Sequence, residues 1–105
     1  MNLKKLKIAR NKIDQIDKQI FNLIKKRTSI VRYMLVLKKY KNQIVDHKRI
    51  NLILKNVRQK SVIAGIDPKI TKRIWTSIIW SYVDFQKKKL QEKVIIYYEE
   101  VISSL

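Results

Sequence analysis

Residues 13–37 have the sequence IDQIDKQIFNLIKKRTSIVRYMLVL, and this stretch decides the fold class. Its apolar residues recur at spacings of three and four, which places them along one face of an α-helix. The members of this apolar face are Ile13, Ile16, Ile20, Leu23, Ile24, Ile30, Val31, Met34 and Leu37. The pattern predicts a first helix from about residue 4 to about residue 40.

The predicted first helix is too long for one small domain to cover. About 36 residues at 1.5 Å each span roughly 54 Å, whereas a compact chain of about 100 residues has a radius of gyration near 13 Å. In an isolated chain much of the apolar face would therefore stay in contact with water. We expect a partner chain to cover it.

Two further helices follow the first. Residues 39–45 interrupt the apolar pattern, and Asp46 is a suitable N-cap because its side chain can accept a hydrogen bond from an unpaired backbone N–H. Gly65 tolerates the left-handed backbone that follows a helix end, and Asp67 and Pro68 are typical of the next helix start. The apolar positions are Ile50, Ile53, Leu54, Val57 and Val62 in the second helix, then Ile70, Ile74, Ile78, Tyr82, Phe85 and Leu90 in the third. The sequence predicts an all-α chain of three helices: long, short and long.

Composition limits the classes of function. The length of 105 residues suits a single domain, and the absence of cysteine with only one histidine argues against a disulfide framework or a zinc site. No apolar run reaches the roughly 18 residues of a membrane span. The basic first residues lack the apolar stretch of a signal peptide. We expect no metal, no membrane association and a cytoplasmic location.

The formal net charge of +17 raises the question of nucleic-acid binding, because clustered Lys and Arg neutralise phosphates. Here the positive charge is spread over the whole length, without an Arg-rich tract or a glycine-aromatic RNA motif. A basic helical dimer that binds nucleic acid is therefore kept only as a disfavoured alternative. The same charge can speed the capture of a small anionic ligand.

Five polar residues along the predicted helices suggest a pocket for a small polyanion. They are Arg10, Arg27, Lys38, Arg49 and Gln86. A guanidinium grips a carboxylate with two hydrogen bonds, whereas an ammonium is a point charge on a flexible stem. Taken singly, each has a plainer interpretation: the arginines could pair with acids, Lys38 could be a solvated helix end, and Gln86 could be a surface amide.

The order of these motifs resembles the all-helical, type II chorismate mutase family, which also includes the isochorismate pyruvate lyases. The matching fragments are Arg10, IDQID at 13–17, Arg27, Lys38, DHKR at 46–49, GIDP at 65–68, and Ile78-Ile79 leading to Gln86. The match spans roughly residues 5 to 90 and leaves residues 91–105 as a helical extension of a single domain. The family fold is an intertwined homodimer of three-helix chains, which agrees with the independent expectation of a partner for the first helix.

The resemblance implies a role for each polar residue. Arg10 would bind a substrate carboxylate in the partner's pocket, and Arg27 would bind one within its own chain. Seventeen residues at about 100° each place these two arginines some 100° apart around one helix, so a single straight helix would not bring both to one small ligand. Lys38 and Gln86 would be the catalytic donors to the ether oxygen of the substrate. The other substrate-binding positions are Arg49, Asp46, Ile50 and Tyr82, although Asp46 taken singly fits a helix cap better than a ligand contact.

The chemistry implied by the resemblance needs few reactive groups. A pericyclic reaction of chorismate or isochorismate requires a flexible dianion to be held in one conformer and charge to be stabilised on the breaking ether bond. It requires no nucleophile, metal, cofactor or proton relay. A site made mostly of cations is what such an enzyme needs.

Two positions bear on which reaction is catalysed. Mutases of the family carry Glu directly after the arginine matched by Arg49, where it accepts a hydrogen bond from the C4 hydroxyl of chorismate, and this chain has Ile50. The mutase Ser or Thr four residues before the glutamine is here Tyr82. Isochorismate pyruvate lyases similarly have an aliphatic residue and a tyrosine, whereas Asp46 is closer to the mutase pattern. We favour an isochorismate pyruvate lyase that makes salicylate, with a chorismate mutase of aromatic amino-acid biosynthesis as the alternative.

Overall fold

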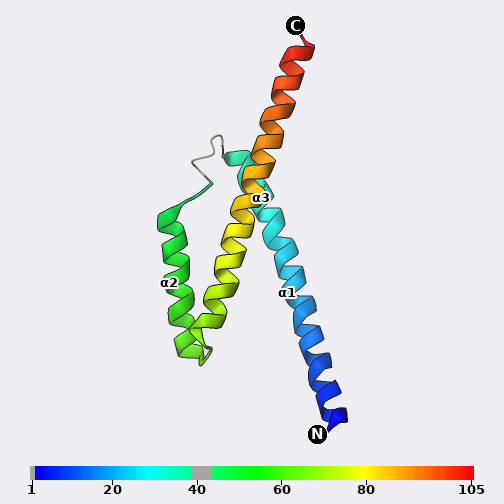
Figure 1. Ribbon diagram of the computed structural model, residues 1–105, viewed down its shortest axis with the longest axis vertical. Coiled ribbons are helices and arrows are strands. Elements are labelled where there is room, and N and C mark those ends of the chain that lie inside the picture. Colours follow the sequence, from blue (N-terminus) through cyan, green and yellow to red (C-terminus); the bar gives the residue numbers. More distant parts are fainter. Residues whose placement is uncertain (1, 39–43) are drawn as a thin grey trace. The chain divides into compact units, whose positions relative to one another are not determined.

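The computed structural model describes residues 2–38 and 44–105 (Figure 1). Within these residues the chain forms three α-helices and no strand: α1 Leu3–Leu37, α2 His47–Ala64 and α3 Pro68–Ser103. The predicted all-α class and the order of long, short and long helices are confirmed.

The first helix ends slightly earlier than the apolar pattern predicts. α1 stops at Leu37, and the backbone N–H of Lys38 bonds to the Leu35 carbonyl at 3.3 Å, which closes the last turn. Lys38 therefore lies just outside the helix. Residues 39–43, which hold most of the predicted break, lie outside the described residues.

Local capping sets both ends of α2. The Asp46 side chain accepts a hydrogen bond from the Arg49 backbone N–H at 2.9 Å, which confirms the predicted N-cap. At the other end Gly65 has φ 70° and ψ 25°, the left-handed conformation that follows a helix end. A Cβ placed on Gly65 would meet no atom within 4 Å. Backbone conformation, not space, is therefore what favours glycine at this position.

The third helix begins as the sequence predicts and continues without a break. The Asp67 side chain accepts from the Lys69 backbone N–H at 2.9 Å, and Pro68 occupies the first turn. Pro is favoured there because its missing N–H would have no helical partner in any case. From this start α3 runs 36 residues to Ser103.

The chain divides into two compact units, which are described separately: the first is Met1–Tyr33 and the second is Met34–Leu105. The described part of the first unit is a single helical stretch. Its apolar face is exposed, with values such as 56% for Ile13 and 63% for Leu23. An exposed apolar face of this length is the feature from which a covering partner was expected.

In the second unit, α2 and α3 pack against each other as a helical hairpin (Figure 1). A buried polar link ties them near the turn. The Ser61 hydroxyl, 2% exposed, donates to the Val57 carbonyl at 2.6 Å and lies 2.7 Å from the Thr71 hydroxyl. The Thr71 hydroxyl also lies 3.3 Å from the Pro68 carbonyl, and each hydroxyl has one hydrogen, so either Ser61 or Thr71 donates in the contact between them.

The buried face of α3 differs from the apolar stripe that the sequence suggested. The buried positions are Ile79, Val83, Gln86 and Leu90, whereas Ile70 and Ile74 are exposed. α3 carries apolar residues on several sides, so periodicity alone could not select the face that packs within one chain. Ile44 joins Val83 and Leu90 in one buried cluster, which brings the segment before α2 against the middle of α3.

Candidate active site

A lysine and a buried glutamine meet in the second unit. The Lys38 ammonium donates to the Gln86 side-chain oxygen, with Nζ and Oε1 2.9 Å apart. Gln86 is 7% exposed, because spacings of three and four place it on the same face of α3 as buried Val83 and Leu90. The interpretation of Gln86 as a surface amide is wrong, and the two predicted catalytic residues are in direct contact.

The hydrogen bonds fix the orientation of the Gln86 amide. A lysine ammonium can only donate, so the atom facing Lys38 must be the oxygen. The Gln86 Nε2 atom donates one hydrogen to the Tyr82 carbonyl at 3.1 Å, one turn earlier on α3. Its second N–H has no hydrogen-bond partner within residues 2–38 and 44–105. The Lys38 ammonium and the Gln86 amide each keep N–H groups that are not used in their mutual hydrogen bond, and these can donate to a ligand.

Tyr82 is half-buried beside Gln86 on α3. Its ring meets the Phe85 ring edge to face, with centroids 6.3 Å apart and planes at 82°. A tyrosine held in this way is bulkier than the Ser or Thr expected at this position in a mutase. It supplies an aromatic surface one turn from the buried amide.

The N-terminus of α2 holds three predicted site residues: the N-cap Asp46, then Arg49 and Ile50. One oxygen of Asp46 is committed to the Arg49 backbone N–H, and the Asp46 carbonyl accepts from the Ile50 N–H at 2.9 Å. This leaves the exposed Arg49 guanidinium to extend from the first turn, while Ile50 is half-buried. At Ile50 the chain offers no acceptor for a substrate hydroxyl.

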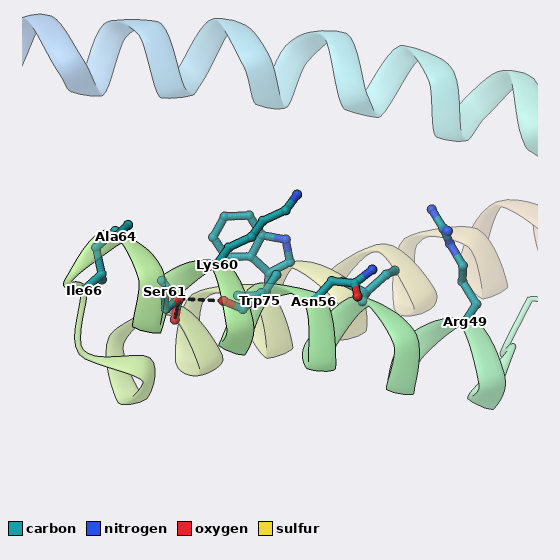
Figure 2. A pocket seen from close by; sticks show the side chains of 10 residues that line it. Arg49, Asn56, Lys60, Ser61, Ala64, Ile66 and Trp75 are labelled. Carbon is teal, nitrogen blue, oxygen red and sulfur yellow. Dashed lines mark hydrogen bonds between the residues drawn. The ribbon is translucent and has the colours of Figure 1, made fainter.

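Arg49 also lines a groove of about 380 Å³ on the α2–α3 hairpin. Figure 2 shows Arg49, Asn56, Lys60 and Trp75 extending on the same side of the hairpin. The sequence analysis did not identify this groove, since it depends on how α2 and α3 pack. Neither Lys38 nor Gln86 lines it. Arg49 therefore belongs both to the predicted site and to the lining of this groove.

The two remaining arginines lie in the first unit. Arg10 is exposed on α1 and Arg27 is half-buried. Their convergence with Lys38 and Gln86 of the second unit stays a prediction.

Within residues 2–38 and 44–105, no group of three or more His, Cys, Asp or Glu side chains could hold a metal ion. None of the described helices is long and apolar enough to cross a membrane.

In a comparison with protein families, residues 9–87 match the model for chorismate mutase type II. The matched region begins one residue before Arg10 and ends one residue after Gln86. The chain has no match among curated proteins and none among solved structures. Residues 88–105, which include the last turns of α3, lie outside the matched region.

Proposed function

The chain belongs to the chorismate mutase type II family, and from this premise we propose that it is an isochorismate pyruvate lyase that acts as a cytoplasmic homodimer. The family is one of enzymes that catalyse a pericyclic isomerisation of chorismate, a small substrate. The proposed lyase reaction is also pericyclic, but it eliminates pyruvate, and its substrate is isochorismate, a dianion closely related to chorismate.

In the proposed reaction the ether bond of isochorismate breaks while the hydrogen on ring carbon C2 moves to the methylene carbon of the enolpyruvyl group. The ether oxygen becomes the keto oxygen of pyruvate, and the ring becomes aromatic as salicylate. Every atom and electron pair is accounted for within the substrate. The protein has to hold the reactive conformer and stabilise the negative charge that develops on the ether oxygen.

The contact between Lys38 and Gln86 is the observation that carries the pericyclic part of this proposal. The ammonium and the amide are held 2.9 Å apart, and the bond from Gln86 Nε2 to the Tyr82 carbonyl orients the buried amide. Donors that need no reorganisation are effective at a developing oxyanion. Lys38 supplies a positive charge, and Gln86 supplies its second N–H.

The residues at positions 50 and 82 support isochorismate over chorismate as the substrate. Chorismate carries its hydroxyl on C4, and an unpaired buried hydroxyl costs roughly 1–3 kcal/mol. Ile50 cannot accept that hydrogen bond. Isochorismate carries its hydroxyl on C2 and makes no such demand on Ile50, and Tyr82 is compatible with the lyase pattern.

Chorismate mutase is the second candidate, because two observations favour it. Asp46 at the start of α2 is closer to the mutase pattern, and the matching family model is that of the mutases. One carboxylate oxygen of Asp46 accepts the capping hydrogen bond from the Arg49 backbone N–H, and the other can accept from a substrate hydroxyl. The two candidates use the same Lys38 and Gln86 donors.

The homodimer supplies the carboxylate-binding groups that a single pocket lacks. We propose that Arg10 reaches the partner's pocket and that Arg27 serves the pocket of its own chain. The exposed apolar face of α1 supports this assembly, because its burial against a partner is favourable by about 25 cal/mol per Å².

A side-by-side assay tests the proposed function. Purified protein is given isochorismate or chorismate, and salicylate and prephenate are quantified. Salicylate formation that is lost in Lys38→Ala and retained in the control Lys48→Ala, an exposed lysine of α2, is the expected result. Prephenate formation without salicylate would assign the protein as a mutase. Turnover of neither substrate would contradict both candidates.

A further inference from the structure

Cations line the side of the α2–α3 hairpin that faces away from Arg49. A groove of about 350 Å³ on this side is bordered by residues of both helices, and an open hollow beside it lies along the start of α3. Lys72 lines both of them, so they form one continuous surface. We call this surface the basic face. Its charged members are Lys55 and Arg58 of α2 with Lys69, Lys72 and Arg73 of α3.

Helix geometry separates the basic face from the groove that Arg49 lines. At about 100° per residue, Arg58 lies about 180° around α2 from Arg49. The groove that Arg49 lines and the groove of the basic face have two lining residues in common, Val57 and Thr71, and these lie at the seam between the helices. The hairpin therefore has two different sides, and Figure 2 shows the one that carries Arg49.

The five cations lie close together along the hairpin. Ser61 of α2 is level with Thr71 of α3, because their hydroxyls are 2.7 Å apart. The two helices run in opposite directions (Figure 1), so Arg58 and Lys55 are level with positions 74 and 77 of α3. The cations thus fall between the levels of positions 69 and 77, about 12 Å at 1.5 Å per residue. Packed helices lie about 8–10 Å apart, so the cations form two neighbouring rows.

Little in the described part of the chain offsets this positive charge. All five side chains are exposed, and none of them forms an ion pair with a described residue. Between residues 47 and 83 the only acid in the sequence is Asp67, and one of its oxygens accepts the capping bond from the Lys69 backbone N–H. The start of α3 adds the partial positive charge of its helix dipole, with no acid in its first turn. The basic face is therefore suited to a partner with many negative charges.

The lining of the basic face favours a phosphodiester backbone over a protein surface. Its exposed side chains are the five cations and Ser77, whereas the apolar lining residues Leu54, Val57 and Pro68 are half-buried. Protein interfaces have an apolar centre from which charged residues are depleted. Lys, Arg and hydroxyl side chains are instead common contacts to phosphate oxygens, and Thr76 and Ser77 supply hydroxyls beside the cations.

We propose that the basic face binds the backbone of a nucleic-acid duplex. Duplex DNA carries one negative charge per about 1.7 Å of its axis, so a length of about 12 Å holds about seven phosphates opposite the cations. Two rows of cations on neighbouring helices can contact phosphates of both strands. Contacts to the backbone carry no sequence information, so this binding is expected to be independent of base sequence.

The packing of α2 on α3 supplies what the sequence lacked. Nucleic-acid binding was disfavoured because the positive charge is spread along the chain without a basic tract. The hairpin brings Lys55 and Arg58 beside Lys72, which are far apart in sequence. The charge is thus concentrated by tertiary structure.

The basic face is separate from the proposed catalytic contact. Neither Lys38 nor Gln86 lines it. Gln86 stands 13 residues after Arg73 in the sequence, about 20 Å farther along α3. Binding at the basic face therefore does not depend on the proposed function.

The salt dependence of duplex binding tests the proposal. Fluorescence anisotropy of a labelled DNA duplex, titrated with the purified protein at several salt concentrations, gives the slope of log K against log [salt]. Each neutralised phosphate contributes about −0.9, so five contacts predict a slope of about −4.5. The combined variant Lys69→Gln, Lys72→Gln and Arg73→Gln loses three contacts, and its slope should be about −1.8.

Matched variants separate the basic face from overall charge. The combination of Lys4→Gln, Lys5→Gln and Lys7→Gln makes the same change in net charge at exposed positions of α1 and should leave the slope unchanged. The combination of Lys55→Gln and Arg58→Gln tests the row on α2 and should give a slope of about −2.7. Circular dichroism checks helix content, although removal of cations from the start of α3 should favour that helix.

Three results would overturn the proposal: equal slopes for the Lys69, Lys72 and Arg73 variant and its control on α1, no duplex binding at about 50 mM salt, or tighter binding to a single strand than to the duplex. Vesicles with anionic lipid and poly-glutamate are tested in parallel. If either is bound through the basic face while the duplex is not, the partner is a membrane surface or an acidic protein and the proposal is wrong.

The readout is binding, not turnover, so the two proposals of the article can fail separately. Lys38→Ala, which is expected to lose turnover, should bind the duplex as the unaltered protein does. Duplex binding through the basic face by a protein that converts neither substrate would support this inference while contradicting the proposed function.

Discussion

Gln86→Leu separates the catalytic contribution of a buried side chain from its structural one. Gln86 lies on the buried face of α3 between Val83 and Leu90, where an apolar residue would pack well. The substitution removes the bond from Lys38 and the bond to the Tyr82 carbonyl, at 2.9 and 3.1 Å. It also removes the N–H proposed to reach the ether oxygen.

The effects on folding nearly cancel. A hydrogen bond from a charged donor contributes about 1.5–3 kcal/mol and a neutral one about 0.5–1.5 kcal/mol, whereas full burial of a leucine side chain contributes about 1.5–3 kcal/mol. The free energy of unfolding should therefore fall by about 1 kcal/mol at the midpoints of these ranges, and by no more than about 3 kcal/mol at their extremes. Loss of one preorganised oxyanion donor lowers kcat on the order of 10²–10³-fold, or about 2.7–4 kcal/mol of transition-state stabilisation. Turnover should fall far more than stability.

Urea unfolding and steady-state turnover of isochorismate, measured on the same preparations, give the two quantities. Gln91→Leu is the matched control, because Gln91 is an exposed glutamine on the same helix and outside the matched family region. It should change neither quantity appreciably. The reasoning would be refuted if Gln86→Leu kept full kcat, or if its activity fell only in proportion to the fraction of unfolded protein.

Three other substitutions test neighbouring parts of the account. Lys38→Ala should lower kcat on the order of 10²–10³-fold, and Lys38→Arg should restore only part of it because the guanidinium fork has a different shape; full turnover in Lys38→Ala would remove Lys38 from the site. Ile50→Glu should raise the ratio of mutase to lyase kcat/KM by roughly tenfold or more, since a hydrogen bond to a charged acceptor contributes about 1.5–3 kcal/mol; an unchanged ratio would separate position 50 from substrate choice. Asp46→Ala should lower the free energy of unfolding by about 1 kcal/mol through loss of the α2 cap. Asp46→Asn should keep most of this stability, because asparagine also caps a helix. Equal losses of stability in the two variants would contradict the capping role.

The shared pocket is tested by mixing two inactive variants. Arg10→Ala and Arg27→Ala should each show almost no turnover. Their heterodimer has one pocket that lacks both arginines and one that keeps both, so activity should partly return on mixing. Subunit exchange shown independently, without any return of activity, would mean that Arg10 does not act across the interface.

Signals that act over a few residues were enough to predict both ends of α2 and the start of α3. Asp46, Gly65 and the Asp67-Pro68 pair each satisfy or remove a specific backbone group within one turn, and the structure has all of them in the predicted conformations. The end of α1 was less well predicted, because Leu37 and Lys38 carry no comparable stop signal. The apolar pattern simply fades there.

Packing between helices could not be predicted from periodicity in this chain. α3 has apolar residues on several sides, so the sequence did not show that Val83 and Gln86 would be buried while Ile70 stayed exposed. The groove beside Trp75 arises from the same tertiary arrangement. By contrast, the family resemblance implied that Lys38 and Gln86, 48 positions apart in sequence, donate to one ether oxygen and so lie close together, although it did not predict their direct hydrogen bond.

Transfer of a deuterium label tests the central claim most directly. Isochorismate deuterated at C2 is incubated with the protein in ordinary water, and the products are examined by mass spectrometry. A pericyclic lyase with no proton relay predicts salicylate and pyruvate in equal amounts, with the deuterium retained in the methyl group of pyruvate. Deuterium lost to water, or isochorismate left intact while chorismate is converted to prephenate, would contradict the account.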